Sequence, residues 1–281
     1  MFDCIVKGGT LADGLGNKPE TGDVAIKDGR IAEVGGRING LAKRVIDADG
    51  ALVTPGWIDL HTHYDGQVSW DSEMAPSSHN GVTTVVMGNC GVGFAPVLEG
   101  QEKELIELME GVEDIPGSAL HEGMEWGKWE TFPEYLDYLE TREFSLDVGA
   151  QIAHGSLRYY AMGERGRLNQ DATEDDLSLM GKLVTEALDA GAVGFSTSRI
   201  IGHRSLWGEP VPGTFAPHQE VLAIAEAMKK SSKGVFQMIP AGTVGKLESL
   251  GGEKATQQEE HDLMVQVSMQ SGRPVTFTLV Q

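Results

Sequence analysis

The chain has 281 residues, of which 40% are hydrophobic and 23% charged, so its composition is typical of a globular protein. Its 22 basic and 42 acidic side chains give a net charge of −20, which argues against nucleic acid or an anionic membrane surface as a partner. Neither a signal peptide nor a run of about 18 apolar residues is evident. The two cysteines, Cys4 and Cys90, are too few for a disulfide framework and fit reduced thiols in a cytoplasmic protein.

Residues 1–54 contain short β-like segments separated by turn signals. Within "GDVAIKDGRIAEVG", Asp28-Gly29 lies between two alternating apolar stretches, which is a strong hairpin signal. We therefore expect an amino-terminal β-sandwich segment over residues 1–54, ahead of the main domain.

Residues 55–281 alternate strand-like and helix-like stretches, which is typical of parallel βα units. Each predicted helix ends in Gly, a common helix stop. The expected strands cover residues 57–63, 82–90, 147–154, 192–198, 235–240 and 274–280, and the expected helices 175–191, 218–234 and 257–272.

A complete (β/α)₈ barrel takes about 250 residues, whereas 281 − 54 = 227 follow the β-segment. Six strands cannot close such a barrel. The fold class that we expect is therefore α/β, the amino-terminal part of a (β/α)₈ TIM-like barrel within a longer protein.

Two histidines end the first predicted strand. Side chains alternate between the two faces of a strand, so His61 and His63 would point the same way and Thr62 the other way. Pro55-Gly56 and Asp65-Gly66 punctuate the chain on either side, which places both histidines at the carboxyl end of the strand. Parallel α/β folds gather their chemistry there, so we predict a metal site; solvent-facing or hydrogen-bonded histidines are the structural alternative.

Cys90 ends the second predicted strand, in "TTVVMGNCGVGFAP". From there its side chain could face His61 and His63 across neighbouring strands, and a thiolate suits zinc alongside imidazole. The alternative is a buried structural thiol, as most free cysteines are.

The stretches "GWIDLHTHYDGQVSWD" and "GVTTVVMGNCGVGFAPV" closely resemble the amidohydrolase superfamily, within it the D-aminoacylase (N-acyl-D-amino-acid deacylase) branch. The resemblance extends over essentially the whole chain, including "GAVGFSTS" as the fourth barrel strand. It implies a metal-dependent barrel hydrolase in which His61, His63 and Cys90 are metal ligands. In this branch the cysteine stands where many relatives use a carbamylated lysine, and "AVGFSTS" accordingly contains no lysine.

The sequence departs from that family at two places. The family supplies further histidine ligands from its fifth and sixth strands, but "VFQMIP" and "TFTLVQ" contain none. We therefore expect one zinc ion and leave a second ion open. The family's catalytic aspartate follows the eighth strand, which would lie beyond Gln281, so the catalytic base is unknown within these residues.

Four further residues are candidates for substrate binding. Arg199 and Arg204 follow the fourth predicted strand and could bind a carboxylate in bidentate fashion, as could the neighbouring His203. His154 ends the third strand and could line the pocket or replace a missing ligand. Solvation for the arginines, and a hydrogen-bonded structural role for His154, are the alternatives.

The connection over residues 91–145 is unusually long. Connections of this length are usually functional or carry their own structure. We expect one or two helices there, acting either as a lid or as a packing elaboration.

The function favoured by the sequence is hydrolysis of the amide bond of an N-acyl-D-amino acid, a small-molecule substrate, with release of a carboxylate and a D-amino acid. A cyclic amidase or deaminase on the same scaffold is one alternative, because the barrel hosts many chemistries. A non-catalytic interaction protein is another: the retained ligands count against it and the missing histidines for it. A homo-oligomer is compatible with the sequence.

Overall fold

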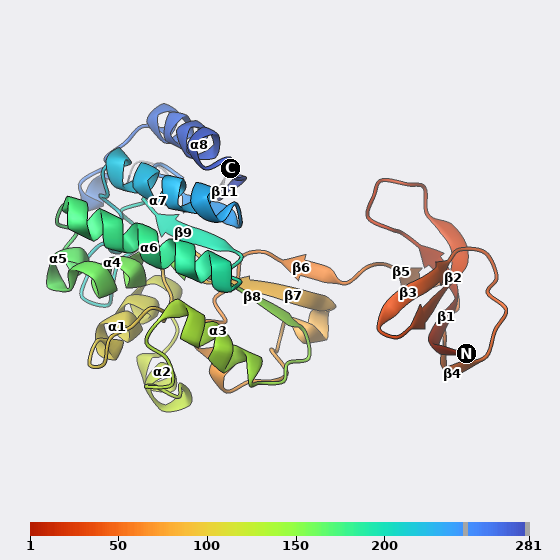
Figure 1. Cartoon of the computed structure of the whole chain (residues 1–281). Helices are drawn as coiled ribbons and strands as arrows, with labels where there is room; N and C mark the ends of the chain where they lie inside the picture. Colours follow the sequence, from red (N-terminus) through yellow and green to blue (C-terminus); the bar gives the residue numbers. More distant parts are fainter. Residues whose placement is uncertain (244–246, 279–281) are drawn as a thin grey trace. The chain divides into compact units, whose positions relative to one another are not determined.

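A computed structural model describes residues 1–243 and 247–278 (Figure 1). The chain divides into two compact units, Met1–Trp57 and Ile58–Gln281. The expected boundary after residue 54 lies close to this division. Among the described residues, no helix combines the length and the apolar character needed to cross a membrane.

The amino-terminal unit is built on one five-stranded sheet, in the order β3-β2-β1-β4 with β5 paired to β1. β2 and β3 form the hairpin that the sequence indicates, and both turn residues, Asp28 and Gly29, have the positive φ that a two-residue hairpin turn requires. A small core of Ile5, Ala25 and Ile38 lies in this unit. The strands are β1 (Phe2–Leu11), β2 (Glu20–Lys27), β3 (Arg30–Val34), β4 (Ala42–Asp47) and β5 (Leu52–Val53).

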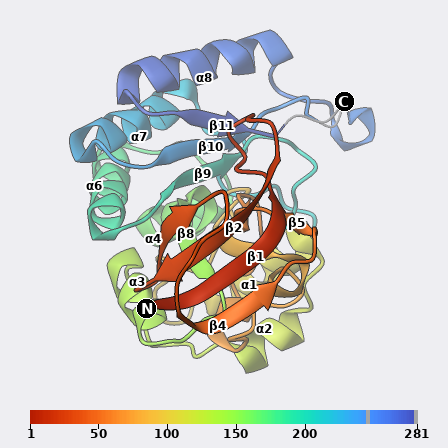
Figure 2. The same cartoon turned by 90° about the vertical axis from the view of Figure 1, so that its right-hand side faces the viewer.

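A six-stranded sheet, in the order β11-β10-β9-β8-β7-β6, forms the centre of the second unit. The pairs β7–β8, β8–β9, β9–β10 and β10–β11 are parallel, and Figure 2 shows β8 to β11 following one another in this order. The α/β class with six barrel-type strands is thus confirmed. The strands are β6 (Trp57–Asp59), β7 (Val82–Met87), β8 (Asp147–Ala153), β9 (Gly194–Ser198), β10 (Val235–Ile239) and β11 (Val275–Phe277).

Helices cover this sheet, and α6, α7 and α8 pack side by side in sequence order. α3, α6 and α8 each begin with a capping box, in which a threonine and an acidic residue three positions later satisfy free backbone N–H groups. The helices are α1 (Glu102–Glu113), α2 (Gly117–Gly123), α3 (Phe132–Glu140), α4 (His154–Met162), α5 (Glu164–Arg167), α6 (Glu174–Ala190), α7 (His218–Ser231) and α8 (Gln257–Ser271), with short 3₁₀ turns at Gln67–Ser69, Ser78–Asn80 and Glu248–Leu250.

Each of the six strands is shorter than the sequence predicts, and for two of them the difference concerns the site. β6 stops at Asp59 and β7 at Met87, so the expected metal ligands follow the strands instead of belonging to them. Residues 279 and 280 of the predicted strand 274–280 lie outside the described residues, which end at 278, and so does Gln281. The long connection of residues 91–145 carries three helices, α1, α2 and α3.

Candidate metal centre

His61 and His63 lie in the loop that follows β6. Between them, Thr62 donates both its backbone N–H and its hydroxyl to the carbonyl of Val86, at 3.0 and 2.8 Å. The side chain of Asn89 donates in turn to the carbonyls of Thr62 and Val86. These bonds hold the histidine loop, which bends at Leu60 and His61, against the end of β7.

Cys90 occupies a tight turn after β7. Its φ is 56°, in the left-handed region, and its side chain is buried. Gly88, also at positive φ, is required because a Cβ there would lie 2.2 Å from the carbonyl oxygen of Gln151. The Cys90 N–H donates to Gln237 Oε1 and the Gly91 N–H to Ser196 Oγ, so β9 and β10 support the turn.

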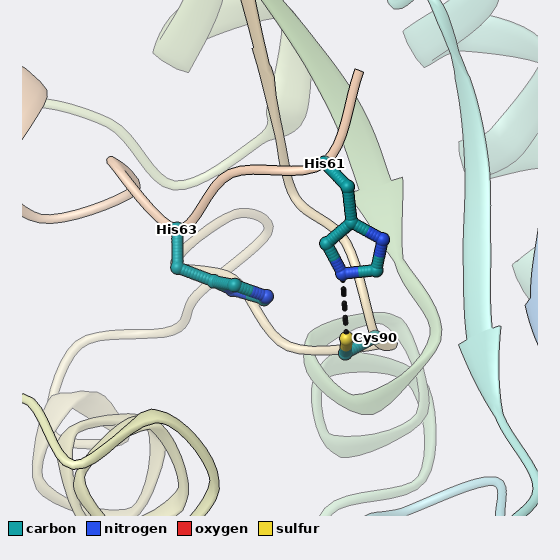
Figure 3. A group of neighbouring side chains, drawn as sticks. All are labelled: His61, His63 and Cys90. Carbon is teal, nitrogen blue, oxygen red and sulfur yellow. Dashed lines mark hydrogen bonds between the residues drawn. The ribbon is translucent and has the colours of Figure 1, made fainter. Parts of the chain in front are cut away.

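The three predicted ligands converge on one point (Figure 3). One ligand atom from each of His61, His63 and Cys90 lies within 4.8 Å of the other two. His61 Nε2 is 3.1 Å from Cys90 Sγ, and the two imidazole centroids are 5.5 Å apart. The three donors thus meet at the carboxyl ends of β6 and β7.

His63 has acidic neighbours on both sides of its ring. Asp65 Oδ2 lies 3.8 Å from Nδ1, and Glu113 Oε1 lies 3.2 Å from Nε2. Neither contact has hydrogen-bond geometry, so both buried ring nitrogens of His63 lack a hydrogen-bond partner among the described residues. Buried polar atoms of this kind normally find a partner, and a bound cation would supply one.

The electrostatics of the site follow from its burial. Burial, then the charges of His61 and His203, lowers the pKa of His63 to about 3. Burial also lowers the pKa of His61 against the opposing influence of Asp59. Burial and the negative charges of Glu113 and Asp65 raise the pKa of the Cys90 thiol. Both imidazoles are therefore neutral near pH 7, as metal ligation requires, and the thiol needs a cation beside it to ionise.

The residues fit a metal ion of the zinc type. Two neutral imidazoles and one thiol are the nitrogen and sulfur donors that zinc prefers, and both ring nitrogens of His63 lack a hydrogen-bond partner among the described residues. Three protein ligands also leave a position open, as in catalytic zinc sites.

His154 lies at the start of α4, where its two ring nitrogens already have partners. Nδ1 is 2.9 Å from Thr197 Oγ1 and Nε2 is 2.8 Å from Glu220 Oε1. Arg158 also pairs with Glu220, and all of these groups are buried. The hydrogen-bonded structural alternative therefore describes the contacts of His154, and its substrate-binding role stays a prediction.

The two arginines after β9 have protein partners as well. Arg199 is buried and donates from Nε to both oxygens of Glu260, at 2.9 and 3.0 Å, and from a terminal nitrogen to the carbonyl of Ala216. Arg204 donates to the carbonyls of Ile201 and Gly208, and both bonds lie within the loop that contains Arg204. Binding of a substrate carboxylate by either arginine stays a prediction. Such a carboxylate would have to compete with the protein groups that each arginine already contacts.

Sequence reasoning missed two acidic residues beside the ligands. Asp65 is buried, and burial raises its pKa to about 8. Burial raises the pKa of Glu113, at the end of α1, to about 7. Asp65 follows the histidines directly and could have been noticed, whereas Glu113 is one of many acidic residues in the long connection. His203 lies near His61 and bonds to Ser198 Oγ, and burial lowers its pKa to about 4.

Comparison with known proteins places this centre in a family. The amidohydrolase family matches residues 44–281. The D-aminoacylase of Alcaligenes xylosoxydans xylosoxydans is 33% identical over 196 residues, which cover 70% of this chain and 37% of that enzyme. The N-acyl-D-aspartate deacylase of the same organism is 32% identical over 234 residues, covering 83% of this chain and 42% of that one.

A solved structure agrees with these relatives. The N-acyl-D-glutamate deacylase from Bordetella bronchiseptica, complexed with zinc and a phosphonate mimic of the tetrahedral intermediate, superposes with a TM-score of 0.71 at 25% identity, covering 98% of this chain and 50% of that one. The chain thus spans half or less of the length of these proteins. The chain belongs to the amidohydrolase family, in the branch of D-aminoacylase and the N-acyl-D-amino-acid deacylases.

Proposed function

We propose that the complete protein hydrolyses the amide bond of N-acyl-D-amino acids, releasing a carboxylate and a free D-amino acid. The observation that carries the proposal is the convergence of His61, His63 and Cys90 within 4.8 Å. The relatives named D-aminoacylase and N-acyl-D-aspartate deacylase support the substrate class.

We further propose that the centre holds a single zinc ion. The donors are two imidazoles and one thiol, and β10 and β11 contain no histidine that could hold a second ion. The zinc complex of the related N-acyl-D-glutamate deacylase supports the choice of metal.

Each ligand has a defined part in this chemistry. When bound, the metal polarises the substrate carbonyl and lowers the pKa of a bound water. His61 and His63 remain neutral because burial lowers the pKa of each, so each offers one nitrogen lone pair without first having to release a proton. Asp65 Oδ2 lies 3.8 Å from His63 Nδ1, on the side of the ring where a carboxylate partner of a metal-bound imidazole would stand.

The test is an assay of the complete purified protein. Its zinc content is measured, and release of free D-amino acid is followed from N-acetyl-D-glutamate, N-acetyl-D-aspartate and N-acetyl-D-methionine, with the L-enantiomers as controls. We expect turnover of D-substrates that a chelator abolishes and zinc restores. His61→Ala should lose this activity, whereas His79→Ala, at an exposed histidine away from the site, should keep it. Turnover that survives both chelation and His61→Ala would refute the proposal.

A further inference from the structure

Gln237 of β10 presents its side chain to the same side of the sheet as the turn that carries Cys90. Its neighbours Phe236 and Met238 are fully buried in the apolar core. Side chains alternate between the two faces of a strand, so Gln237 points to the opposite face. There the Cys90 N–H donates to Gln237 Oε1 at 3.3 Å, and the glutamine is only 5% exposed. A buried, uncharged carboxamide thus borders the predicted metal centre.

The contact with Cys90 fixes which end of the carboxamide is free. The reversed amide would set its NH₂ group against the Cys90 N–H, donor against donor, so Oε1 faces the turn and Nε2 is the free end. Nε2 is buried and has no hydrogen-bond partner among residues 1–243 and 247–278. Because buried amide donors nearly always have a partner, we expect this one to serve a group that enters the site from outside.

The neighbouring polar groups are already engaged. Ser196, paired in register with Gln237 on β9, accepts from the Gly91 N–H. Oε1 of Gln237 is engaged by Cys90, and an amide nitrogen is not a zinc ligand, so Gln237 takes up no coordination position. The open position that hydrolysis needs is therefore preserved, with one uncommitted N–H donor close to it.

We propose that Gln237 Nε2 donates a hydrogen bond to the carbonyl oxygen of the scissile amide. This role rests on the proposed function and deepens it. As water adds to the carbonyl carbon, negative charge develops on that oxygen. The C–N bond then breaks, the oxygen becomes part of the released carboxylate, and the two protons of the water pass to the leaving amine. A donor held in a buried site stabilises the developing charge, as amide side chains do in oxyanion holes.

The experiment compares the complete wild-type protein with Gln237→Glu and Gln237→Met. The glutamate keeps an acceptor for the Cys90 N–H but lacks the donor, and the methionine has a similar size and neither group. Gln270→Met is the matched control, because Gln270 is partly buried on α8 and its amide already donates to the carbonyl of Leu222. Zinc content, thermal melts, kcat and KM for the D-substrate that the wild type turns over fastest, and inhibition by the phosphonate analogue of that substrate are measured for each.

We expect both Gln237 variants to stay folded and zinc-loaded and to lose about 10²–10³-fold in kcat, the usual effect of removing one oxyanion donor, with a smaller change in KM. Affinity for the phosphonate, a tetrahedral anion like the transition state, should fall together with kcat/KM. Gln270→Met should match the wild type.

Three results would overturn this role. Unchanged kcat with raised KM would assign Gln237 to ground-state binding, for example of the substrate carboxylate. Unchanged phosphonate affinity would show that Nε2 does not contact the reacting oxygen. Loss of zinc in both variants would assign Gln237 to the support of Cys90. A zinc-loaded wild type that turns over no D-substrate would instead overturn the proposed function, and this role with it.

Discussion

At the scale of single residues, Cys90 combines an unusual backbone position with the softest donor of the site. We expect Cys90→Ser to keep the fold but to lose most of its zinc, because a neutral hydroxyl replaces a thiolate ligand. Metal analysis of the purified variant tests this, with Cys4→Ser, in the amino-terminal unit, as the control. Full zinc occupancy in Cys90→Ser would exclude the cysteine as a ligand.

The two arginines after β9 should behave differently when replaced by alanine. Arg199→Ala leaves the buried carboxylate of Glu260 without its partner, which should cost about 3–5 kcal/mol of unfolding free energy. Arg204→Ala removes two bonds to carbonyls in a partly exposed loop and should cost about 1 kcal/mol or somewhat more.

Urea unfolding measures both losses, and KM for an N-acyl-D-amino acid is measured alongside. A raised KM for either variant at unchanged stability would support the sequence-based assignment to the substrate carboxylate. Unchanged KM with lowered stability would assign the residue to the scaffold.

The sequence contains the information for the ligands but not for their surroundings. His61, His63 and Cys90 could be predicted because strand ends at one edge of a parallel sheet come together. The partner of Arg199 could not be predicted, because Glu260 is 61 positions away, on α8. The position of Glu113 beside the ligands could not be predicted for the same reason, because it depends on how α1 packs, and no local sequence pattern encodes that packing.

At the scale of elements, a buried network joins α4, β9 and α7. Glu220 of α7 accepts from His154 and pairs with Arg158 of α4. We expect Glu220→Gln to lower the unfolding free energy by about 3–5 kcal/mol, because Arg158 would be left as an unpaired buried charge. Urea unfolding checks this, with Glu226→Gln, a more exposed residue of the same helix, as the control. Equal stability of the two variants would contradict it.

The same network predicts a pH dependence. Burial opposes ionisation of Glu220, but the hydrogen bond and charge of His154, with Arg158, outweigh it and lower its pKa from 4.5 to about 2. Because the folded pKa lies below the unfolded one, this stabilisation is complete above about pH 4.5 and is lost as the pH falls towards 2. The stability difference between wild type and Glu220→Gln should therefore narrow over that range in urea titrations. A difference that stays constant between pH 5 and 3 would contradict the assignment.

Element boundaries show where periodicity stops being informative. The helices α6 and α8 begin and end within about one residue of their predicted limits, since capping threonines and terminal glycines mark them. α7 begins after Pro217 as predicted but ends at Ser231, before the predicted limit at residue 234. The alternation of "WIDLHTH" continues past the end of β6, although the backbone bends at Leu60 and His61 and Thr62 is anchored to Val86 outside regular strand pairing. The sequence pattern does not mark that bend.

At the scale of the whole molecule, the net charge of −20 over these 281 residues would oppose the approach of the anionic substrates of the proposed function. Added salt screens this repulsion, since the Debye length falls from about 30 Å at 0.01 M to about 8 Å at 0.15 M. We expect kcat/KM for N-acetyl-D-glutamate to rise with sodium chloride over this range, and to rise more than for N-acetyl-D-methionine, which carries one charge fewer. Steady-state kinetics at matched pH test this, and a fall in both values would reveal a local attractive field that outweighs the net charge.

The turn at Cys90 has a consequence for the order in which the protein is made. His61 and Cys90 are 29 positions apart, so all three donors of the predicted centre have been synthesised once residue 90 is in place. The bonds that fix the turn arrive much later, because Cys90 receives its contact from Gln237, 147 positions on, and Gly91 from Ser196, 105 positions on. During synthesis, the three donors are therefore present long before the residues that fix the turn around Cys90. An ion captured during translation would be bound weakly at first, and its affinity would rise only when β9 and β10 join the sheet.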